Sequence, residues 1–190
     1  MQISIIGAGH VGLVSGACFA DLGNHVVLMD HDRQKLAAIR KGRVPFYEPG
    51  LEELVHQGLA EGRLHFVATI REAVAQGTVI FLCVGTPPRP NGEADLTAVE
   101  NATRQIAQAM RSYRLIVEKS TVPVETGEWI KRTMQLAARK GGRYDVASNP
   151  EFLREGSAIQ DFLHPDRIVL GVESPRAREL LVELYKPLNA

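Results

Sequence analysis

The sequence is poor in cysteine, has no excess of either charge and contains no long apolar segment. Its two cysteines, Cys18 and Cys83, both lie in apolar segments, which argues against a disulfide framework and suits a reducing compartment. Lys plus Arg number 22 and Asp plus Glu number 22, so no basic surface is predicted that would attract nucleic acid or an anionic membrane. The apolar run 79–84 is far below the roughly 20 residues that a membrane helix needs.

No targeting segment is recognisable at the N-terminus. A secretory signal has a basic stretch followed by a longer apolar one, whereas residues 1–7 read MQISIIG and turn glycine-rich at once. We therefore expect a cytoplasmic protein. With 190 residues, 45% of them apolar, the chain is long enough to bury a real core but too short for two generous domains, so we expect residues 1–190 to form one domain.

Short apolar runs alternate with longer helical patterns, which is typical of βαβ units. The expected strands, several of them apolar without alternation, are 2–6, 25–30, 64–68, 78–84, 115–119, 144–147 and 167–171. Apolar positions at spacings of three and four predict helices over 11–22, 33–41, 51–60, 97–110, 126–139 and 175–184. Uniformly apolar strands are typical of a sheet that is covered on both faces. The sequence therefore predicts an α/β fold, with a doubly wound, mainly parallel sheet and helices on both of its faces.

Prolines and glycines cluster between these elements, at 44–50, at 85–92 and around 149–150. A parallel sheet presents its ligand site outside the carboxyl ends of its strands. These three loops are therefore candidate site loops.

The first expected strand runs directly into residues 7–12, GAGHVG, a G-x-G-x-x-G motif that opens a helix. Gly7 permits the tight turn, Gly9 lets the backbone approach a pyrophosphate, and Gly12 allows close packing of helix on strand. Asp30 ends the second strand 18 residues after Gly12, where its carboxylate can accept from ribose hydroxyls and repel a 2′-phosphate. The motif predicts a Rossmann-like domain that prefers NAD to NADP. The alternative is a plain strand-to-helix turn with Asp30 as a strand-end cap.

Residues 84–87, VGTP, end the fourth strand with a small residue, a hydroxyl and a rigid proline. This arrangement can bring the backbone and Thr86 Oγ1 to the cofactor edge, although a structural turn would look similar. Cys83 is tempting as a nucleophile, but its apolar strand neighbours favour a buried core thiol with a raised pKa. The same interpretation holds for Cys18 in the first helix.

Two further strand ends carry polar residues. Residues 119–123 read KSTVP, and residues 148–159 read SNPEFLREGSAI. If the second segment is helical, Glu151 and Glu155 lie on one face, where one of them could serve as a base. The alternative is a solvated helix face relieved by Arg154, and spacing alone favours it.

Five motifs in this order resemble the UDP-glucose/GDP-mannose dehydrogenase family, with the UDP-glucose 6-dehydrogenase branch as the nearest match. They are the glycine motif 7–12, the segments 47–51 (YEPGL), 84–87 and 119–123, and the segment 149–156 (NPEFLREG); the segment 161–171 is similar as well. Members of this family oxidise the C6 alcohol of a nucleotide sugar to a carboxylate with two NAD⁺, through a thiohemiacetal and a thioester on a cysteine. The resemblance thus implies NAD as the cofactor and a nucleotide sugar, UDP-glucose above all, as the substrate.

The resemblance also implies roles for individual residues. The implied cofactor-binding residues are Gly7, Gly9, His10, Val11, Gly12, Asp30, Lys35, Val84, Gly85, Thr86, Pro87, Ser120, Thr121 and Glu155. A cation at Lys35 can cover the adenosine side of the cofactor. The segment from Glu151 through Phe152, Leu153 and Arg154 to Glu155 matches the stretch that lines the nucleotide-sugar site.

The implied catalytic residues are Thr121, Glu151 and Glu155. Thr121 resembles the family threonine that positions a water, and Glu151 resembles the general base of thioester hydrolysis. A base in this role needs hydrogen-bond reach to the water and a pKa tuned by partial burial. No metal ligands are assigned.

The sequence departs from the family pattern in two details and one larger feature. His10 stands where tyrosine is common, and Glu125 stands where glycine is common. The family's catalytic cysteine, in a Gly-Gly-Ser-Cys type motif, and its catalytic lysine and asparagine belong to a C-terminal and a helical middle domain that these 190 residues do not include. The resemblance therefore implies an NAD-binding domain that binds NAD without turnover by itself.

Two alternatives remain open at this level. The substrate could be GDP-mannose or a UDP-N-acetylhexosamine, because base and sugar selection depend largely on domains outside the 190 residues. The chain could also be a non-catalytic module that senses the redox state through NAD.

The resemblance implies a homodimer for the full-length enzyme, formed mostly through the middle domain. Residues Leu180, Leu181, Leu184 and Tyr185 either form an exposed patch where that domain docks or are the inward stripe of the last helix, and we expect at least two of them to point inward.

Overall fold

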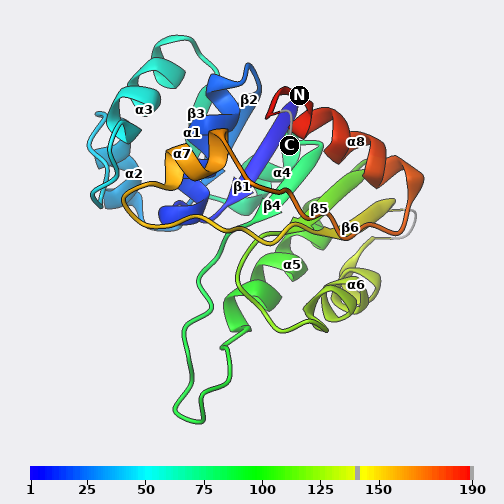
Figure 1. The fold of residues 1–190 in the computed structure, drawn as a ribbon. Helices are drawn as coiled ribbons and strands as arrows, with labels where there is room; N and C mark the ends of the chain where they lie inside the picture. Colours follow the sequence, from blue (N-terminus) through cyan, green and yellow to red (C-terminus); the bar gives the residue numbers. More distant parts are fainter. Residues whose placement is uncertain (140–141, 189–190) are drawn as a thin grey trace.

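The computed structural model describes residues 1–139 and 142–188 of the chain. Six strands form a single parallel sheet in the order β3-β2-β1-β4-β5-β6 (Figure 1). The strands are β1 (Gln2–Ile6), β2 (His25–Met29), β3 (Leu64–Val67), β4 (Val79–Leu82), β5 (Arg114–Glu118) and β6 (Tyr144–Ser148). The chain reverses its direction of winding between β1 and β4, so these two strands flank the point where such sheets bind ligands.

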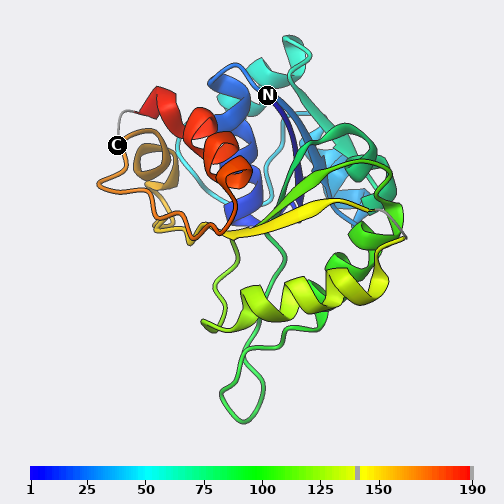
Figure 2. The ribbon, with the colours of Figure 1, turned by 90° about the vertical axis from the view of Figure 1, so that its right-hand side faces the viewer.

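Helices cover both faces of the sheet. They are α1 (His10–Asp21), α2 (Arg33–Ile39), α3 (Leu51–Ala60), α4 (Ile70–Gln76), α5 (Thr97–Ala109), α6 (Thr126–Ala137), α7 (Ala158–Leu163) and α8 (Pro175–Tyr185). Figure 2 shows α7 and α8 on one side of β6 and α6 on the other. Successive residues of β4 belong to different cores: Phe81 packs with the α1, α7 and α8 face, and Ile80 packs with the α4, α5 and α6 face. This double burial explains why the strand is apolar without alternation.

The predicted fold class is confirmed. Six of the seven expected strands and all six expected helices are present, with ends that differ by at most two residues from those expected. The sequence predicted these elements well because the strands are mostly apolar or alternate and the helices carry a 3.6-residue pattern.

The expected seventh strand, 167–171, is wrong. Within the described residues, the segment makes one antiparallel bridge, between Gly171 and Ser148, and otherwise runs as extended coil. Its alternation arises because Ile168 and Leu170 pack on the core while Val169 is exposed. Extended coil on a core surface thus imitates the pattern of a strand.

Two short helices, α4 and α7, were not expected, and the helix considered for the segment that carries Glu151 and Glu155 is absent. Helix α4 starts with a capping box, in which the Thr69 hydroxyl accepts from the Glu72 backbone N–H and the Glu72 carboxylate accepts from the Thr69 backbone N–H. This local signal did not lead to a predicted helix, because seven residues give only a weak apolar pattern. Helix α7 begins only at Ala158, so Glu151 and Glu155 do not share a helical face. The segment between them is irregular, so the interpretation of this segment as a solvated helix face relieved by Arg154 is wrong as well.

The last helix turns its apolar stripe inward. Leu181, Leu184 and Tyr185 are buried, and Leu180 is partly buried against the same core. The inward alternative for α8 is therefore confirmed. In the described part of the chain, no helix is both long and apolar enough to cross a membrane.

Candidate functional site

The glycine motif forms the turn between β1 and α1. Gly7 has φ +108°, and a Cβ there would collide with the carbonyl oxygen of Cys83 at the end of the neighbouring strand β4. A Cβ on Gly12 would collide with the carbonyl oxygen of Gly7. A Cβ on Gly9 would meet no atom within 4 Å among the described residues, so this position faces open space. The loop thus combines two glycines required by packing with one that leaves room for a ligand at a helix N-terminus, as a pyrophosphate site requires.

Asp30 follows β2 and is 4% exposed. Its Oδ2 accepts from Ala8 N at 3.0 Å and from Lys35 Nζ at 2.6 Å, and its Oδ1 accepts from Asp32 N at 3.0 Å. Burial alone would raise the pKa of Asp30, but these hydrogen bonds and the Lys35 charge outweigh it and hold the pKa below its usual value. The carboxylate is therefore ionised and fixed against the glycine loop. Because a carboxylate oxygen accepts about two hydrogen bonds, Oδ1 retains capacity for a ribose hydroxyl.

The loops after β4 and β5 are joined by hydroxyl groups. Thr86 Oγ1 donates to Thr121 O at 2.8 Å, and Ser120 Oγ donates to Val84 O at 2.9 Å. Four of the residues predicted to bind the cofactor thus lie together at the carboxyl ends of adjacent strands. This position is where a parallel sheet of this order holds its ligand.

Both cysteines are buried core thiols. Burial raises the pKa of Cys18 and of Cys83 to about 12, although the nearby Lys119 charge opposes the shift at Cys83. A thiol with such a pKa has almost no thiolate at neutral pH, so neither side chain is a suitable nucleophile.

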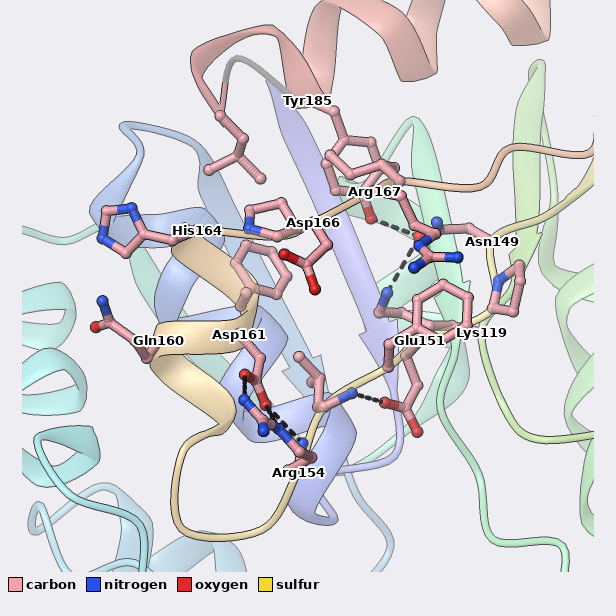
Figure 3. Close-up of a pocket in the computed structure, with 17 residues that line it drawn as sticks. Lys119, Asn149, Glu151, Arg154, Gln160, Asp161, His164, Asp166, Arg167 and Tyr185 are labelled. Carbon is pink, nitrogen blue, oxygen red and sulfur yellow. Dashed lines mark hydrogen bonds and ion pairs between the residues drawn. The ribbon is translucent and has the colours of Figure 1, made fainter.

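A cavity of about 530 Å³ opens beside the segment that follows β6 (Figure 3). Glu151, Phe152, Leu153 and Arg154 line it, together with Lys119 and Asn149. A second cavity, of about 620 Å³, is lined by Thr121 and Glu151. Glu151 therefore stands between the two cavities and shares one of them with the predicted water-positioning residue, Thr121.

The segment that carries Glu155 is held in place by contacts of the preceding residue, Arg154, with Asp161. Arg154 forms an ion pair with Asp161 at 2.6 Å, and the Arg154 backbone N–H donates to the same carboxylate at 2.9 Å (Figure 3). Hydrogen bonds from Arg154 hold the pKa of Asp161 at about 2. Glu155 itself is exposed and is not among the residues that line either cavity.

Several polar residues of this region were missed by the sequence analysis. Lys119, 4% exposed, donates to Asn149 Oδ1 at 3.1 Å, and Tyr185 OH donates to the same oxygen (Figure 3). Asn149 Nδ2 in turn donates to Val169 O at 3.0 Å. Burial lowers the pKa of Lys119. A lysine and an asparagine at the ends of adjacent apolar strands were the only available signal.

The described residues contain no group of three or more potential metal ligands.

Glu48 was also missed as a site residue, although it belongs to the YEPGL motif. Its carboxylate is buried and contacts both His10 of the glycine loop and the backbone at Gly156. The sequence shows that this residue is acidic. It does not show that the chain returns to it 108 positions later, at Gly156.

Comparison with known proteins gives a consistent result. The model of the UDP-glucose/GDP-mannose dehydrogenase family, NAD binding domain, matches residues 1–189. A UDP-glucose 6-dehydrogenase from Rhizobium meliloti (strain 1021) is 50% identical over 99% of this chain and 44% of that protein, and the UDP-glucose 6-dehydrogenase TuaD of Bacillus subtilis (strain 168) is 45% identical over 100% and 41%. The chain thus spans about two fifths of the length of these curated relatives.

Solved structures agree. A UDP-glucose dehydrogenase from Pyrobaculum islandicum has a TM-score of 0.96 at 45% identity and covers 100% of this chain and 45% of that one. A GDP-mannose dehydrogenase from Pseudomonas aeruginosa has a TM-score of 0.95 at 36% identity, again with 100% and 45% coverage.

Proposed function

The chain belongs to the UDP-glucose/GDP-mannose dehydrogenase family as its NAD-binding domain, and from this premise we propose that the whole protein oxidises the C6 alcohol of UDP-glucose to the carboxylate of UDP-glucuronate. The observation that carries this proposal is the glycine turn at the carboxyl end of β1, where the strand order reverses toward β4, together with the cavity that Thr121 and Glu151 share. The identity of 45–50% to UDP-glucose 6-dehydrogenases, against 36% to a GDP-mannose dehydrogenase, supports the choice of sugar nucleotide.

We propose that residues in different loops of this chain bind different parts of the cofactor. Gly9 admits the pyrophosphate at the turn that Gly7 and Gly12 make possible, and Asp30 with Lys35 orients the adenosine ribose through the free capacity of Oδ1. NAD⁺, when bound, supplies the hydride acceptor for both oxidation steps. The proposal includes NAD contacts from Thr86, Thr121 and the remaining residues that the resemblance implied.

Water activation is assigned to the second cavity. We assign Thr121 to hold a water and Glu151 to accept its proton, because both residues line this cavity of about 620 Å³. Glu151 Oε2 accepts from Leu153 N, so one oxygen is fixed by the backbone while the carboxylate keeps further acceptor capacity. The nucleophile is proposed to come from outside these 190 residues, because both cysteines here are buried with a pKa of about 12.

The cofactor part of the proposal is tested by titrating the purified 190 residues with NAD⁺ and NADP⁺ in a calorimeter. We expect NAD⁺ to bind and NADP⁺ to bind at least about tenfold more weakly, because Asp30 is ionised and repels a 2′-phosphate. The Asp30→Asn variant should narrow this difference. Equal affinity for the two cofactors in the original chain would contradict the role of Asp30.

The substrate part is tested on the whole protein with a panel of UDP-glucose, GDP-mannose and UDP-N-acetylhexosamines, by measuring NADH formation. We expect UDP-glucose to be oxidised with two NADH per molecule. We expect no NADH from the 190 residues alone, and production there would contradict the assignment of the nucleophile.

A further inference from the structure

Glu48 is a buried carboxylate that joins three segments far apart in the sequence. It lies between α2 and α3 and is 5% exposed. Its Oε2 accepts from Gly156 N at 2.8 Å and lies 3.1 Å from His10 Nε2, and its Oε1 accepts from Ala158 N at 2.8 Å. Both carboxylate oxygens are therefore used to hold other parts of the chain.

The first of these parts is the glycine loop. His10 is the first residue of α1 and belongs to the G-x-G-x-x-G motif. Its ring also packs on Phe46, with 4.8 Å between the ring centroids. Two residues of the segment 44–50 thus contact the glycine loop from the same side, one by packing and one by a hydrogen bond.

The second part is the turn that follows Glu155. Gly156 has φ +87°, a conformation that side chains rarely adopt, and its N–H points at Glu48. Because a single oxygen, Oε2, contacts both His10 and Gly156, this turn is held directly beside the start of α1. The backbone of Glu155, which is adjacent in sequence, is thereby kept near the start of α1.

The charge state of Glu48 suits this role. Burial alone would raise its pKa, but the hydrogen bonds from Gly156, His10 and Ala158 outweigh burial and hold the pKa below its usual value. Among residues 1–139 and 142–188, no lysine or arginine forms an ion pair with Glu48. An ionised carboxylate buried in this way depends on its N–H donors, so the three segments are held together as one unit.

We propose that Glu48 is a positioning residue for the cofactor, which sets the distance between the glycine loop and the 154–158 turn so that Glu155 reaches bound NAD. The inference rests on the proposed function, because it assumes that the domain binds NAD and that Glu155 contacts it. Glu48 does not touch the cofactor in this role and acts through Gly156 and His10.

The test is a set of NAD⁺ titrations on Glu48→Ala, Glu48→Gln, Glu155→Gln and the double variants. We expect Glu48→Ala to weaken NAD⁺ binding about tenfold and Glu48→Gln to weaken it less, because glutamine keeps one acceptor oxygen. Glu155→Gln should weaken binding in the original chain but have little further effect when Glu48 is alanine. This lack of additivity distinguishes positioning of Glu155 from a general loss of stability.

Glu72→Gln is the matched control. Glu72 also caps a helix, because its carboxylate accepts from the Thr69 backbone N–H at the start of α4 on the opposite face of the sheet, so its variant should lower stability without changing the affinity for NAD⁺. Circular dichroism monitors folding, and where the alanine variant unfolds the same cycle is measured on Glu48→Gln.

Additive effects of Glu48 and Glu155, or an unchanged affinity in the folded Glu48 variants, would overturn the inference while leaving NAD binding intact. Absence of NAD⁺ binding in the original chain would overturn the proposed function instead.

Discussion

Two glycines in the same loop illustrate how much is decided at the level of a single residue. A methyl group at Gly12 would meet the carbonyl oxygen of Gly7, whereas a methyl group at Gly9 would project into open space. The motif shows only that both positions are glycine. Packing explains Gly12, whereas no contact of the described residues explains Gly9, which we propose admits a ligand.

This contrast predicts opposite results for two alanine variants. Gly12→Ala should lower the free energy of unfolding by about 1–3 kcal/mol through overpacking. Gly9→Ala should change stability by less than about 0.5 kcal/mol but weaken NAD⁺ binding roughly tenfold, which is about 1.4 kcal/mol. Urea denaturation and calorimetric titration measure the two quantities, and a folded Gly9→Ala variant with full NAD⁺ affinity would refute the prediction.

Glu118 is a buried carboxyl group at the end of β5, and its Oε1 has no hydrogen-bond partner among the described residues. Burial raises its pKa from the usual 4.5 to about 7, although the Lys119 charge opposes the shift. Because the folded pKa is the higher one, the protonated carboxyl favours the folded state. That contribution is complete below pH 4.5 and is lost as the pH rises through 7.

The Glu118→Gln variant should therefore gain stability relative to the original chain as the pH rises. Between pH 5 and pH 8 the difference in unfolding free energy should shift by roughly 2–3 kcal/mol in favour of the variant, because glutamine does not titrate. Urea denaturation at the two pH values provides the measurement. A difference that does not depend on pH would mean that Glu118 is not protonated in the folded protein.

At the scale of elements, Asn149 joins parts that the sequence keeps apart. Its side chain accepts from Lys119 at the end of β5 and from Tyr185 of α8, and donates to Val169 of the extended segment. The hydroxyl of Tyr185 thereby anchors the last helix to the ends of β5 and β6, beside the cavity of about 530 Å³. Loss of this hydroxyl should loosen α8 without removing its apolar packing.

Tyr185→Phe should lower the free energy of unfolding by about 1 kcal/mol, the net value of a buried hydrogen bond. Tyr47→Phe is the matched control, because Tyr47 is 84% exposed and should tolerate the change. Equal stability of the two variants in urea denaturation would show that the Tyr185 hydroxyl contributes nothing.

The elements that sequence reasoning missed share a physical cause. Helix α4 has seven residues and α7 has six, so each offers only a weak 3.6-residue pattern, although α2, also of seven residues, was predicted. The segment 167–171 alternates because it lies on the core, yet it pairs with β6 only at Gly171. The long helices were predictable from pattern, whereas α4, α7 and the extended segment 167–171 depended on the surface that they cover.

At the scale of the whole molecule, NAD should act as a stabilising ligand. Its predicted contacts come from the loops after β1, β2, β4 and β5 and from the 154–158 turn, so the bound state joins segments across the sheet. Binding to the folded state alone should raise the free energy of unfolding by about 2.7 kcal/mol at a hundredfold excess over Kd. Thermal melts with increasing NAD⁺ measure this gain, and a melting temperature that does not change with NAD⁺ would argue against a cofactor site in the folded domain.

The sequence by itself determined the parallel α/β fold, the glycine turn and the acid at the end of β2, because each depends on local pattern or on residues within one βαβ unit. The tertiary structure alone decided the partners of Glu48, Lys119 and Asn149, and the shared cavity of Thr121 and Glu151. These relations join residues 20 to 110 positions apart. Periodicity carries no information about which distant loops meet, because that depends on strand order and on how the chain crosses the sheet.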